Sequence, residues 1–176
     1  SFAARAKQIA ETSEFNLILM SENIDAMKAA VEATAFKRPL IYAATEANAD
    51  DFGALAMEKG LPLAVKADSV EALVPLTDKL TGMGVKDMVL DPGSREAKQS
   101  MEDMVAIRRS SLKDLNRSVG FPTITFPCEM AANLDMETLI ASMHVAKYGA
   151  IVVLSDFTGE SLFPLLLERL NIFTDP

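Results

Sequence analysis

The chain has 176 residues, of which 17 are Lys or Arg and 25 are Asp or Glu, so its net charge at pH 7 is −8. A nucleic-acid binder needs a basic face that neutralises phosphates, and this acidic balance therefore argues against nucleic-acid binding. Hydrophobic residues make up 49% of the chain, which allows a large core and excludes intrinsic disorder. No apolar run approaches the roughly 18 residues of a membrane span, so we expect no membrane association.

Cys128 is the only cysteine, which excludes an internal disulfide and any zinc or iron–sulfur site built from several cysteines of this chain. A cytoplasmic location fits this cysteine usage best. The chain starts at Ser1, and we expect no signal peptide. It stops at Asp175 and Pro176 directly after an apolar helix, where proline would lead into further chain. We therefore expect a fragment of a longer protein.

Six short apolar runs are predicted as strands, and longer segments of helical period separate them, an alternation typical of repeated βα units. Most runs are apolar at consecutive positions, as expected for parallel strands buried on both faces. Three of them begin with proline, at positions where a strand tolerates a missing N–H. The predicted strands span residues 16–21, 39–44, 62–67, 87–91, 122–126 and 150–155.

The first predicted helices have clear starts and stops. Residues 1–12 form a helix, and a capping residue within 21–23 precedes a second helix with an apolar stripe from Ile24 to Val31. Two aspartates favour the start of the third helix through the helix dipole, and Gly60 ends that helix.

The later helices are longer. Ser69 opens the fourth helix, which Pro75 kinks or restarts and which glycines end at positions 82 and 84. The remaining predicted helices span residues 95–118, 134–148 and 161–170, the last with Pro164 in its first turn.

Two architectures accept successive βα units: an open doubly wound sheet and part of a (βα)8 barrel. The turn after the first strand, residues 19–24, contains no glycine, which disfavours a dinucleotide-binding sheet. A barrel needs about 250 residues, so this chain is short by about two units. The sequence therefore predicts an α/β fold of the (βα)8 TIM-barrel type with about six of the eight units, residues 1–176 forming one partial barrel domain.

Barrel proteins bind ligands at the C-terminal ends of their strands. Asp91 ends the fourth strand and is followed by a Pro-Gly turn and Arg95, so we expect this segment to hold a polar ligand, with Arg95 facing an anion. The alternative is that Asp91 only braces the turn. Thr45 and Asn48 follow the second strand and are predicted to present an amide to a ligand, or else to begin the next helix. Other strand-end candidates are Met20, Ser21, Lys66, Asp68, Phe126, Cys128, Glu129, Ser155 and Asp156.

No catalytic residue is predicted. His144, the only histidine, lies in the middle of a helix, away from any strand end. Cys128 has no histidine or lysine nearby in the sequence to lower its pKa, so we expect it to pack as a small hydrophobe. Lys66 allows a Schiff base if its side chain points into a site. No metal ligand set is predicted either.

Several segments, in order along the chain, resemble one protein family. They are residues 39–48 (PLIYAATEAN), 61–65 (LPLAV), 89–93 (VLDPG) with Arg95 and Glu96, 107–109 (IRR) and 171–176 (NIFTDP). Together they resemble the large (gamma) subunit of the corrinoid iron–sulfur protein of the CO dehydrogenase/acetyl-CoA synthase system.

The resemblance implies a subunit with an N-terminal [4Fe–4S] domain, a central barrel and a C-terminal corrinoid domain, of which this chain matches only the barrel. It implies no cofactor in this segment, with the corrinoid and the [4Fe–4S] cluster held elsewhere. It also implies transfer of a methyl group from a methyl-tetrahydropterin, through a methyltransferase, to acetyl-CoA synthase. The implied partners are a smaller corrinoid-protein subunit, that methyltransferase and acetyl-CoA synthase.

Three functions therefore remain open at the sequence level. The first is a non-catalytic scaffold of the methyl carrier. The second is a methyltransferase-like barrel that binds a pterin through Asp91 and Asn48. The third is an aldolase-type barrel that uses Lys66.

Overall fold

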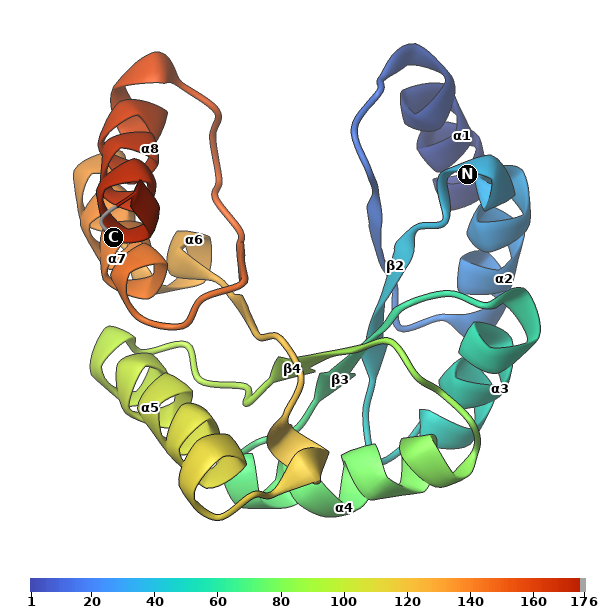
Figure 1. The fold of residues 1–176 in the computed structure, drawn as a ribbon. Helices are drawn as coiled ribbons and strands as arrows, with labels where there is room; N and C mark the ends of the chain where they lie inside the picture. Colours follow the sequence, from blue (N-terminus) through green and yellow to red (C-terminus); the bar gives the residue numbers. More distant parts are fainter. Residues whose placement is uncertain (175–176) are drawn as a thin grey trace. The chain divides into compact units, whose positions relative to one another are not determined.

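The computed structural model of the chain describes residues 1–174, and helices and parallel strands alternate along them (Figure 1). The residues form two compact units. The first comprises Ser1–Ala67 and Ala72–Val89, and the second comprises Asp68–Glu71 and the chain from Leu90 onward. No helix within residues 1–174 is long and apolar enough to cross a bilayer.

The first unit is built on a sheet in the order β1-β2-β3-β4. Parallel pairing aligns Ile18 with Leu40 and Ile41 with Leu63, so successive strands run side by side in sequence order. The elements are α1 (Phe2–Thr12), β1 (Ile18–Met20), α2 (Ile24–Ala33), the 3-10 helix η1 (Ala35–Lys37), β2 (Leu40–Ala44), α3 (Ala49–Lys59), β3 (Leu63–Lys66), α4 (Val70–Gly82) and β4 (Met88–Asp91).

The second unit begins with the end of β4, where Leu90 forms a parallel bridge to Thr123. β5 and β6 pair in parallel, Ile124 with Ile151. The elements are α5 (Ala97–Lys113), the 3-10 helix η2 (Arg117–Val119), β5 (Ile124–Thr125), α6 (Pro127–Met130), α7 (Leu134–Ala146), β6 (Ile151–Val152) and α8 (Gly159–Thr174).

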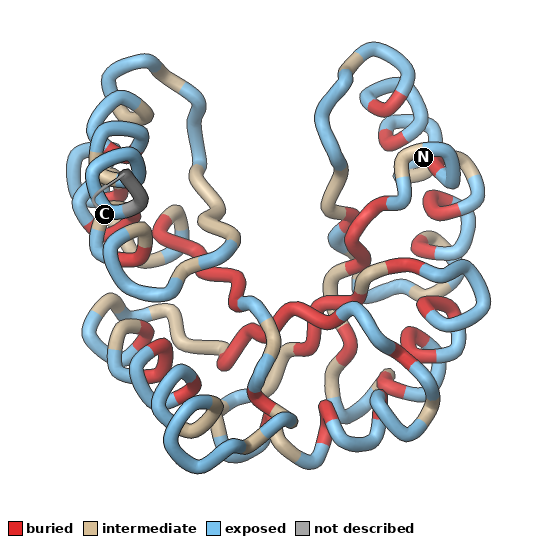
Figure 2. Tube along the Cα trace, in the orientation of Figure 1, coloured by how far each residue is buried: buried red, intermediate tan, exposed pale blue. Residues whose placement is uncertain are grey.

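Buried residues are concentrated in strands β2, β3, β4 and β5 and on one side of most helices (Figure 2). Strand residues such as Ile41, Leu63 and Leu90 are fully buried, and helix residues such as Phe52 are buried too. This burial on both faces of the strands explains why the strands are apolar at consecutive positions.

The six predicted strands are confirmed, although each is shorter than its apolar run. Several helix ends also lie where the sequence places them. Asn23 caps α2 by accepting a hydrogen bond from the N–H of Ala26 at 2.9 Å. Gly60 ends α3 in the left-handed region with φ of +64°, which a residue without a Cβ adopts without strain.

The predicted helix over residues 95–118 is too long. α5 begins after Glu96, whose carboxylate caps it, and ends at Lys113. Leu115 lies outside the helix with φ of +53°, and its side chain and that of Leu112 are exposed rather than core-facing. The apolar pattern does not predict this helix end, because it continues through Leu115. In the structure the helix ends at Lys113 and the chain turns into η2.

Pro75 lies inside α4, which continues through it, so the expected restart is wrong and the expected kink stays a prediction. Pro164 lies inside α8 and not in its first turn, because that helix already begins at Gly159. The apolar pattern also gives no sign of α6, a single turn with Pro127 at its start. The expectation about Asp175 and Pro176 lies outside the described residues.

Candidate functional site

The segment after β4 forms a tight turn around a buried carboxylate. Asp91 ends the strand with only 1% of its side chain exposed. Its Oδ1 accepts a hydrogen bond at 2.8 Å from the N–H of Gly93, whose φ is +81°. Asp91 therefore braces the Pro-Gly turn, as one of the two expectations for this residue states.

Arg95 neutralises the same carboxylate. Its Nη1 donates to Asp91 Oδ1 at 3.1 Å and its Nη2 donates to Asp91 Oδ2 at 2.8 Å, a two-bond contact of the strongest kind. Nη1 also donates to the Ser94 carbonyl at 3.1 Å. The planar fork of the guanidinium is thereby fixed against the turn.

Residues from the next βα unit complete the environment of Arg95. Arg95 Nε donates to Glu129 Oε2 at 2.5 Å, and the guanidinium carbon lies 4.4 Å from the centroid of the Phe126 ring. Phe126 follows β5 and Glu129 lies in α6. The sequence predicts both at strand ends but not their contacts with Arg95, because these contacts depend on the fold, which sets β5 beside β4.

A second polar cluster fixes the start of α5. Ser94 Oγ donates to Asp103 Oδ2, and Gln99 Nε2 donates to Asp103 Oδ1 at 2.9 Å. Asp103 is not predicted from the sequence, because an acidic residue within a long helix gives no sign that its side chain reaches back to the preceding turn.

Thr45 and Asn48 come together in the first unit, in the turn between β2 and α3. The N–H of Thr45 donates to Asn48 Oδ1 at 2.6 Å, and Asn48 Nδ2 donates to the Ala43 carbonyl at 3.4 Å. The amide therefore stabilises its own turn, and Asn48 lies at the N-terminal boundary of α3. The structure thus joins Thr45 to Asn48 and Asp91 to Arg95, and the two pairs belong to different units.

Cys128 lies in α6 and is partly exposed. Burial raises the pKa of its thiol, and the carboxylates of Glu129 and Glu137 raise that pKa further. Glu137 is itself buried and accepts hydrogen bonds from the N–H of Ser155 at 2.5 Å and from its hydroxyl at 2.6 Å. A thiol with a raised pKa is a poor nucleophile at neutral pH.

His144 is buried in α7, with 1% of its surface exposed. Its Nε2 lies 3.3 Å from Ser100 Oγ, and its Nδ1 has no hydrogen-bond partner within residues 1–174. Burial lowers the pKa of the imidazole, so the ring is neutral at pH 7. Its burial keeps it from any substrate, and among the described residues no three His, Cys, Asp or Glu side chains form a group that could hold a metal ion.

The clusters described above hold turns and helix starts in place. The profile of one protein family, the CO dehydrogenase/acetyl-CoA synthase delta subunit, matches residues 1–176. The chain belongs to this family. The family resemblance predicted from the sequence is confirmed.

Relatives with names support the assignment. The chain is 42% identical over 176 residues to the corrinoid/iron-sulfur protein large subunit of Moorella thermoacetica, covering 100% of this chain and 39% of that protein. It is 32% identical to the acetyl-CoA decarbonylase/synthase complex subunit gamma of Archaeoglobus fulgidus, covering 91% of this chain and 36% of that protein. The chain therefore spans about two fifths of the length of these relatives, each of which is named as a subunit.

Solved structures confirm the fold. A Yersinia pestis DHPS with a pterine-sulfa conjugate superposes with a TM-score of 0.65 at 13% identity, covering 97% of this chain and 74% of that one. A truncated 3-deoxy-D-arabino-heptulosonate 7-phosphate synthase of Thermotoga maritima gives a TM-score of 0.53 at 13% identity, with coverage of 97% and 80%. The α/β fold is of the TIM-barrel type with about six βα units, as predicted.

Proposed function

We propose that this chain is the barrel segment of a corrinoid iron–sulfur methyl carrier and serves there as a scaffold. The observation that carries the proposal is the match over all 176 residues to a corrinoid/iron-sulfur protein large subunit at 42% identity. In the proposed reaction the full-length protein receives a methyl group from a methyl-tetrahydropterin through a methyltransferase and delivers it to acetyl-CoA synthase.

This segment supplies neither the four cysteine ligands of a [4Fe–4S] cluster nor an accessible imidazole ligand for a corrinoid metal. A [4Fe–4S] cluster takes four cysteine thiolates, and the chain has one cysteine. His144, the only imidazole, is buried against Ser100, so it is not available to a corrinoid metal. We therefore propose that the rest of the full-length protein holds both groups.

The strand-end residues support a structural role. Asp91 and Glu129 both bind Arg95, and Asn48 binds its own turn together with Thr45. These contacts fix the loops that precede α5 and α3, and a scaffold needs rigid loops of this kind. That these four residues, Asp91, Asn48, Thr45 and Arg95, also contact a ligand stays a prediction.

The proposed partners are a smaller corrinoid-protein subunit, the methyltransferase and acetyl-CoA synthase, in the cytoplasm. The names of the relatives support membership of such a complex. Purification of the complex through a tag on the full-length protein tests these partners. We expect all three to co-purify, and a full-length protein that remains alone under anaerobic conditions would contradict the assignment.

Cofactor content tests the scaffold role. Full-length protein, purified without oxygen, is expected to show corrinoid absorbance together with cobalt and iron, and the variants Asn48→Ala and Glu129→Gln are expected to retain both metals at wild-type levels. Loss of cobalt in either variant would show that the barrel holds the corrinoid directly. Absence of both metals from the wild type would contradict the methyl-carrier proposal itself.

The alternative is a pterin-binding barrel, and the Yersinia structure is of a protein in complex with a pterine-sulfa conjugate. In this alternative Asp91 and Asn48 hold the pterin ring. Titration of a reduced tetrahydropterin into the full-length protein and its Asp91→Ala and Asn48→Ala variants distinguishes the two functions. Tight binding that both variants abolish favours the pterin-binding barrel, whereas equal binding or no binding in all three favours the scaffold.

A further inference from the structure

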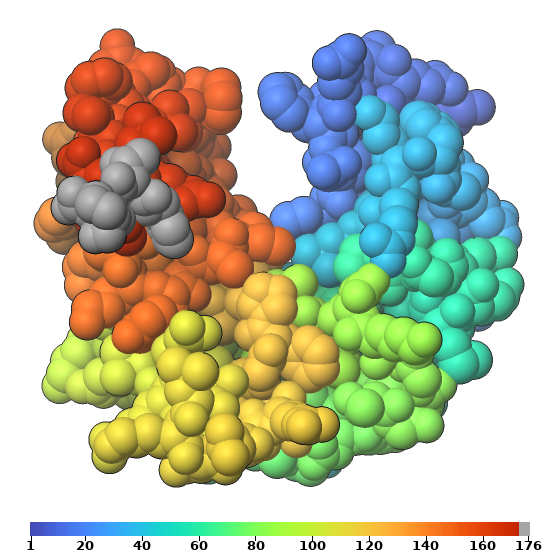
Figure 3. Space-filling view, viewed as in Figure 1, coloured from blue at the N-terminus to red at the C-terminus, as the bar shows by residue number. Residues whose placement is uncertain are grey.

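A cavity of about 250 Å³ lies in the second unit at the N-terminal ends of β5 and β6, away from the strand ends that carry Asp91 and Arg95. The last turns of α5 form one wall of the cavity, and the segment from η2 to β5 forms another. Figure 3 shows these two segments, yellow to orange, side by side on the surface. The residues that line the cavity include Arg108, Ser111, Gly120, Thr123 and Tyr148.

The charge of this cavity is opposite to that of the chain. The net charge of the chain is −8, yet none of the described residues that line the cavity is acidic, and Arg108 lines it. Residues 108–117, which include the adjoining end of α5, hold four basic residues and one acidic residue. Lys147 adds a further cation 5.9 Å from the Tyr148 ring. The cavity therefore has a local positive potential.

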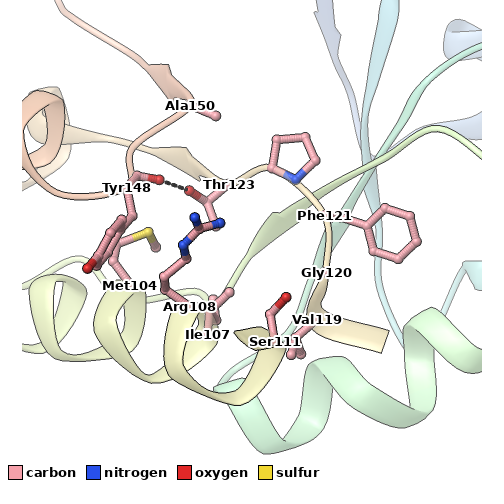
Figure 4. A pocket seen from close by; sticks show the side chains of 11 residues that line it. Met104, Ile107, Arg108, Ser111, Val119, Gly120, Phe121, Thr123, Tyr148 and Ala150 are labelled. Atoms are coloured by element: carbon pink, nitrogen blue, oxygen red, sulfur yellow. Dashed lines mark hydrogen bonds between the residues drawn. The ribbon is translucent and has the colours of Figure 1, made fainter. Parts of the chain in front are cut away.

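Two polar side chains line the cavity without a hydrogen-bond or ion-pair partner among the described residues. Arg108 and Ser111 lie one helical turn apart on α5, and neither side chain forms a hydrogen bond or ion pair within residues 1–174. The guanidinium carbon of Arg108 lies 5.7 Å from the centroid of the Tyr148 ring. Figure 4 shows the guanidinium between that ring and the Ser111 hydroxyl. The N–H groups of Arg108 therefore donate no hydrogen bond to the described residues.

The frame around these donors is rigid. Thr123 is buried, and its hydroxyl donates to the Tyr148 carbonyl at 2.8 Å, which fixes the backbone beneath the ring. A Cβ at Gly120 would lie 3.5 Å from Ser111 Oγ, so the glycine leaves the space beside that hydroxyl open. An arginine fork and a hydroxyl donor beside an aromatic face are the groups that bind an oxyanion on a small organic ligand.

We propose that this cavity is a binding site for the phosphate or carboxylate group of a small-molecule ligand. Arg108 binds two oxygens of the anion, and the Ser111 hydroxyl donates a further hydrogen bond to one of the anion's oxygens. The Tyr148 ring packs against the organic part of the ligand. The site does not depend on the methyl-carrier function, since it lies at the opposite ends of the strands and uses none of the same residues.

Inorganic phosphate is the probe that tests the site, titrated calorimetrically into the full-length protein in an oxyanion-free buffer at low ionic strength. The matched control is Arg109, the next residue of α5, which carries the same charge but does not line this cavity. We expect saturable binding that Arg108→Gln weakens about tenfold or more, Ser111→Ala weakens about threefold and Arg109→Gln leaves unchanged. Acetate in place of phosphate shows which of the two anion types the site prefers.

Three results would overturn the proposal. Absence of saturable binding of both anions shows that the cavity is not an oxyanion site. Equal weakening by Arg108→Gln and Arg109→Gln shows a diffuse charge effect. Loss of subunit association in Arg108→Gln, without any change in anion binding, shows that the arginine binds a partner protein instead.

Discussion

Asp91 and Arg95, four residues apart on either side of the turn after β4, bind each other through both carboxylate oxygens, at 3.1 and 2.8 Å. The carboxylate is 1% exposed and the guanidinium side chain 25% exposed, so little water screens the pair. The two side chains depend on each other, because Arg95 neutralises the carboxylate that is buried at the end of β4.

Arg95→Met in the full-length protein is expected to lower the free energy of unfolding by about 3 kcal/mol, because it leaves the buried Asp91 carboxylate without a counter-charge. Urea denaturation measures the change. Lys79→Met is the control, since its partner Asp50 is largely exposed and such a pair contributes about 1 kcal/mol or less. Asp91→Asn in the Arg95→Met background is expected to recover part of the loss, and a further loss in the double variant would contradict this reading.

The buried His144 makes stability depend on pH. Its pKa in the folded protein is below its ordinary value of 6.5, because burial disfavours the imidazolium. As pH falls, the imidazole is therefore protonated in the unfolded chain before it is protonated in the folded protein. The stability that the neutral His144 contributes is fully present above pH 6.5 and is lost as pH falls from there toward the folded-state pKa. We expect the urea midpoint to fall between pH 7.5 and 5.5 by less in His144→Gln than in the wild type. An identical fall in the two proteins would assign the pH dependence to other groups.

Cys128 is expected to react slowly with iodoacetamide at pH 7, because burial and the neighbouring Glu129 and Glu137 carboxylates raise the pKa of its thiol and reduce the thiolate fraction. Peptide mass spectrometry of the full-length protein measures the rate at this cysteine alone. Glu129→Gln should increase the rate, and free N-acetylcysteine serves as the reference. Labelling of Cys128 faster than the reference would contradict this prediction and show that the thiol is activated.

The helix α8 carries an apolar stripe that the described residues leave exposed. Phe163, Leu166, Leu167 and Leu170 recur at i, i+3, i+4 and i+7, and each is at least 44% exposed, while Leu165 between them is buried. The chain spans 39% of its Moorella relative and 74% of the Yersinia chain. We propose that residues of the full-length protein outside this segment cover the stripe.

A photo-cross-linking residue at position 166 of the full-length protein is therefore expected to link to residues of the same polypeptide outside 1–176. Mass spectrometry identifies the linked peptide, and the same label at the exposed polar position Asn171 is the control. Linkage to another subunit or to a second copy would show that the stripe is an intermolecular interface.

The sequence predicts the βα series well because parallel strands buried on both faces leave consecutive apolar runs, and caps such as Asn23 and Gly60 act locally. It overextends α5 because an apolar period continues through Leu112 and Leu115, although neither side chain is buried. It identifies Asp91 and Arg95 from the turn between them. Their contacts with Phe126 and Glu129 depend on the pairing of distant strands, which no local pattern records.

The positive cavity around Arg108 is also invisible at the sequence level. The basic residues between 108 and 117 resemble ordinary solvated helix charges in a chain of net charge −8. Only the packing of η2 and Tyr148 against α5 places Arg108 and Ser111 beside one open space.

The methyl-carrier proposal is tested most directly by loading a labelled methyl group onto the full-length protein. With the cognate methyltransferase and a methyl-tetrahydropterin, the account predicts about one methyl group per bound corrinoid, the same in the wild type and in the barrel variants Asn48→Ala and Glu129→Gln. A full-length protein that binds no corrinoid, or that takes up no methyl group under these conditions, would contradict the assignment of this chain to a methyl carrier.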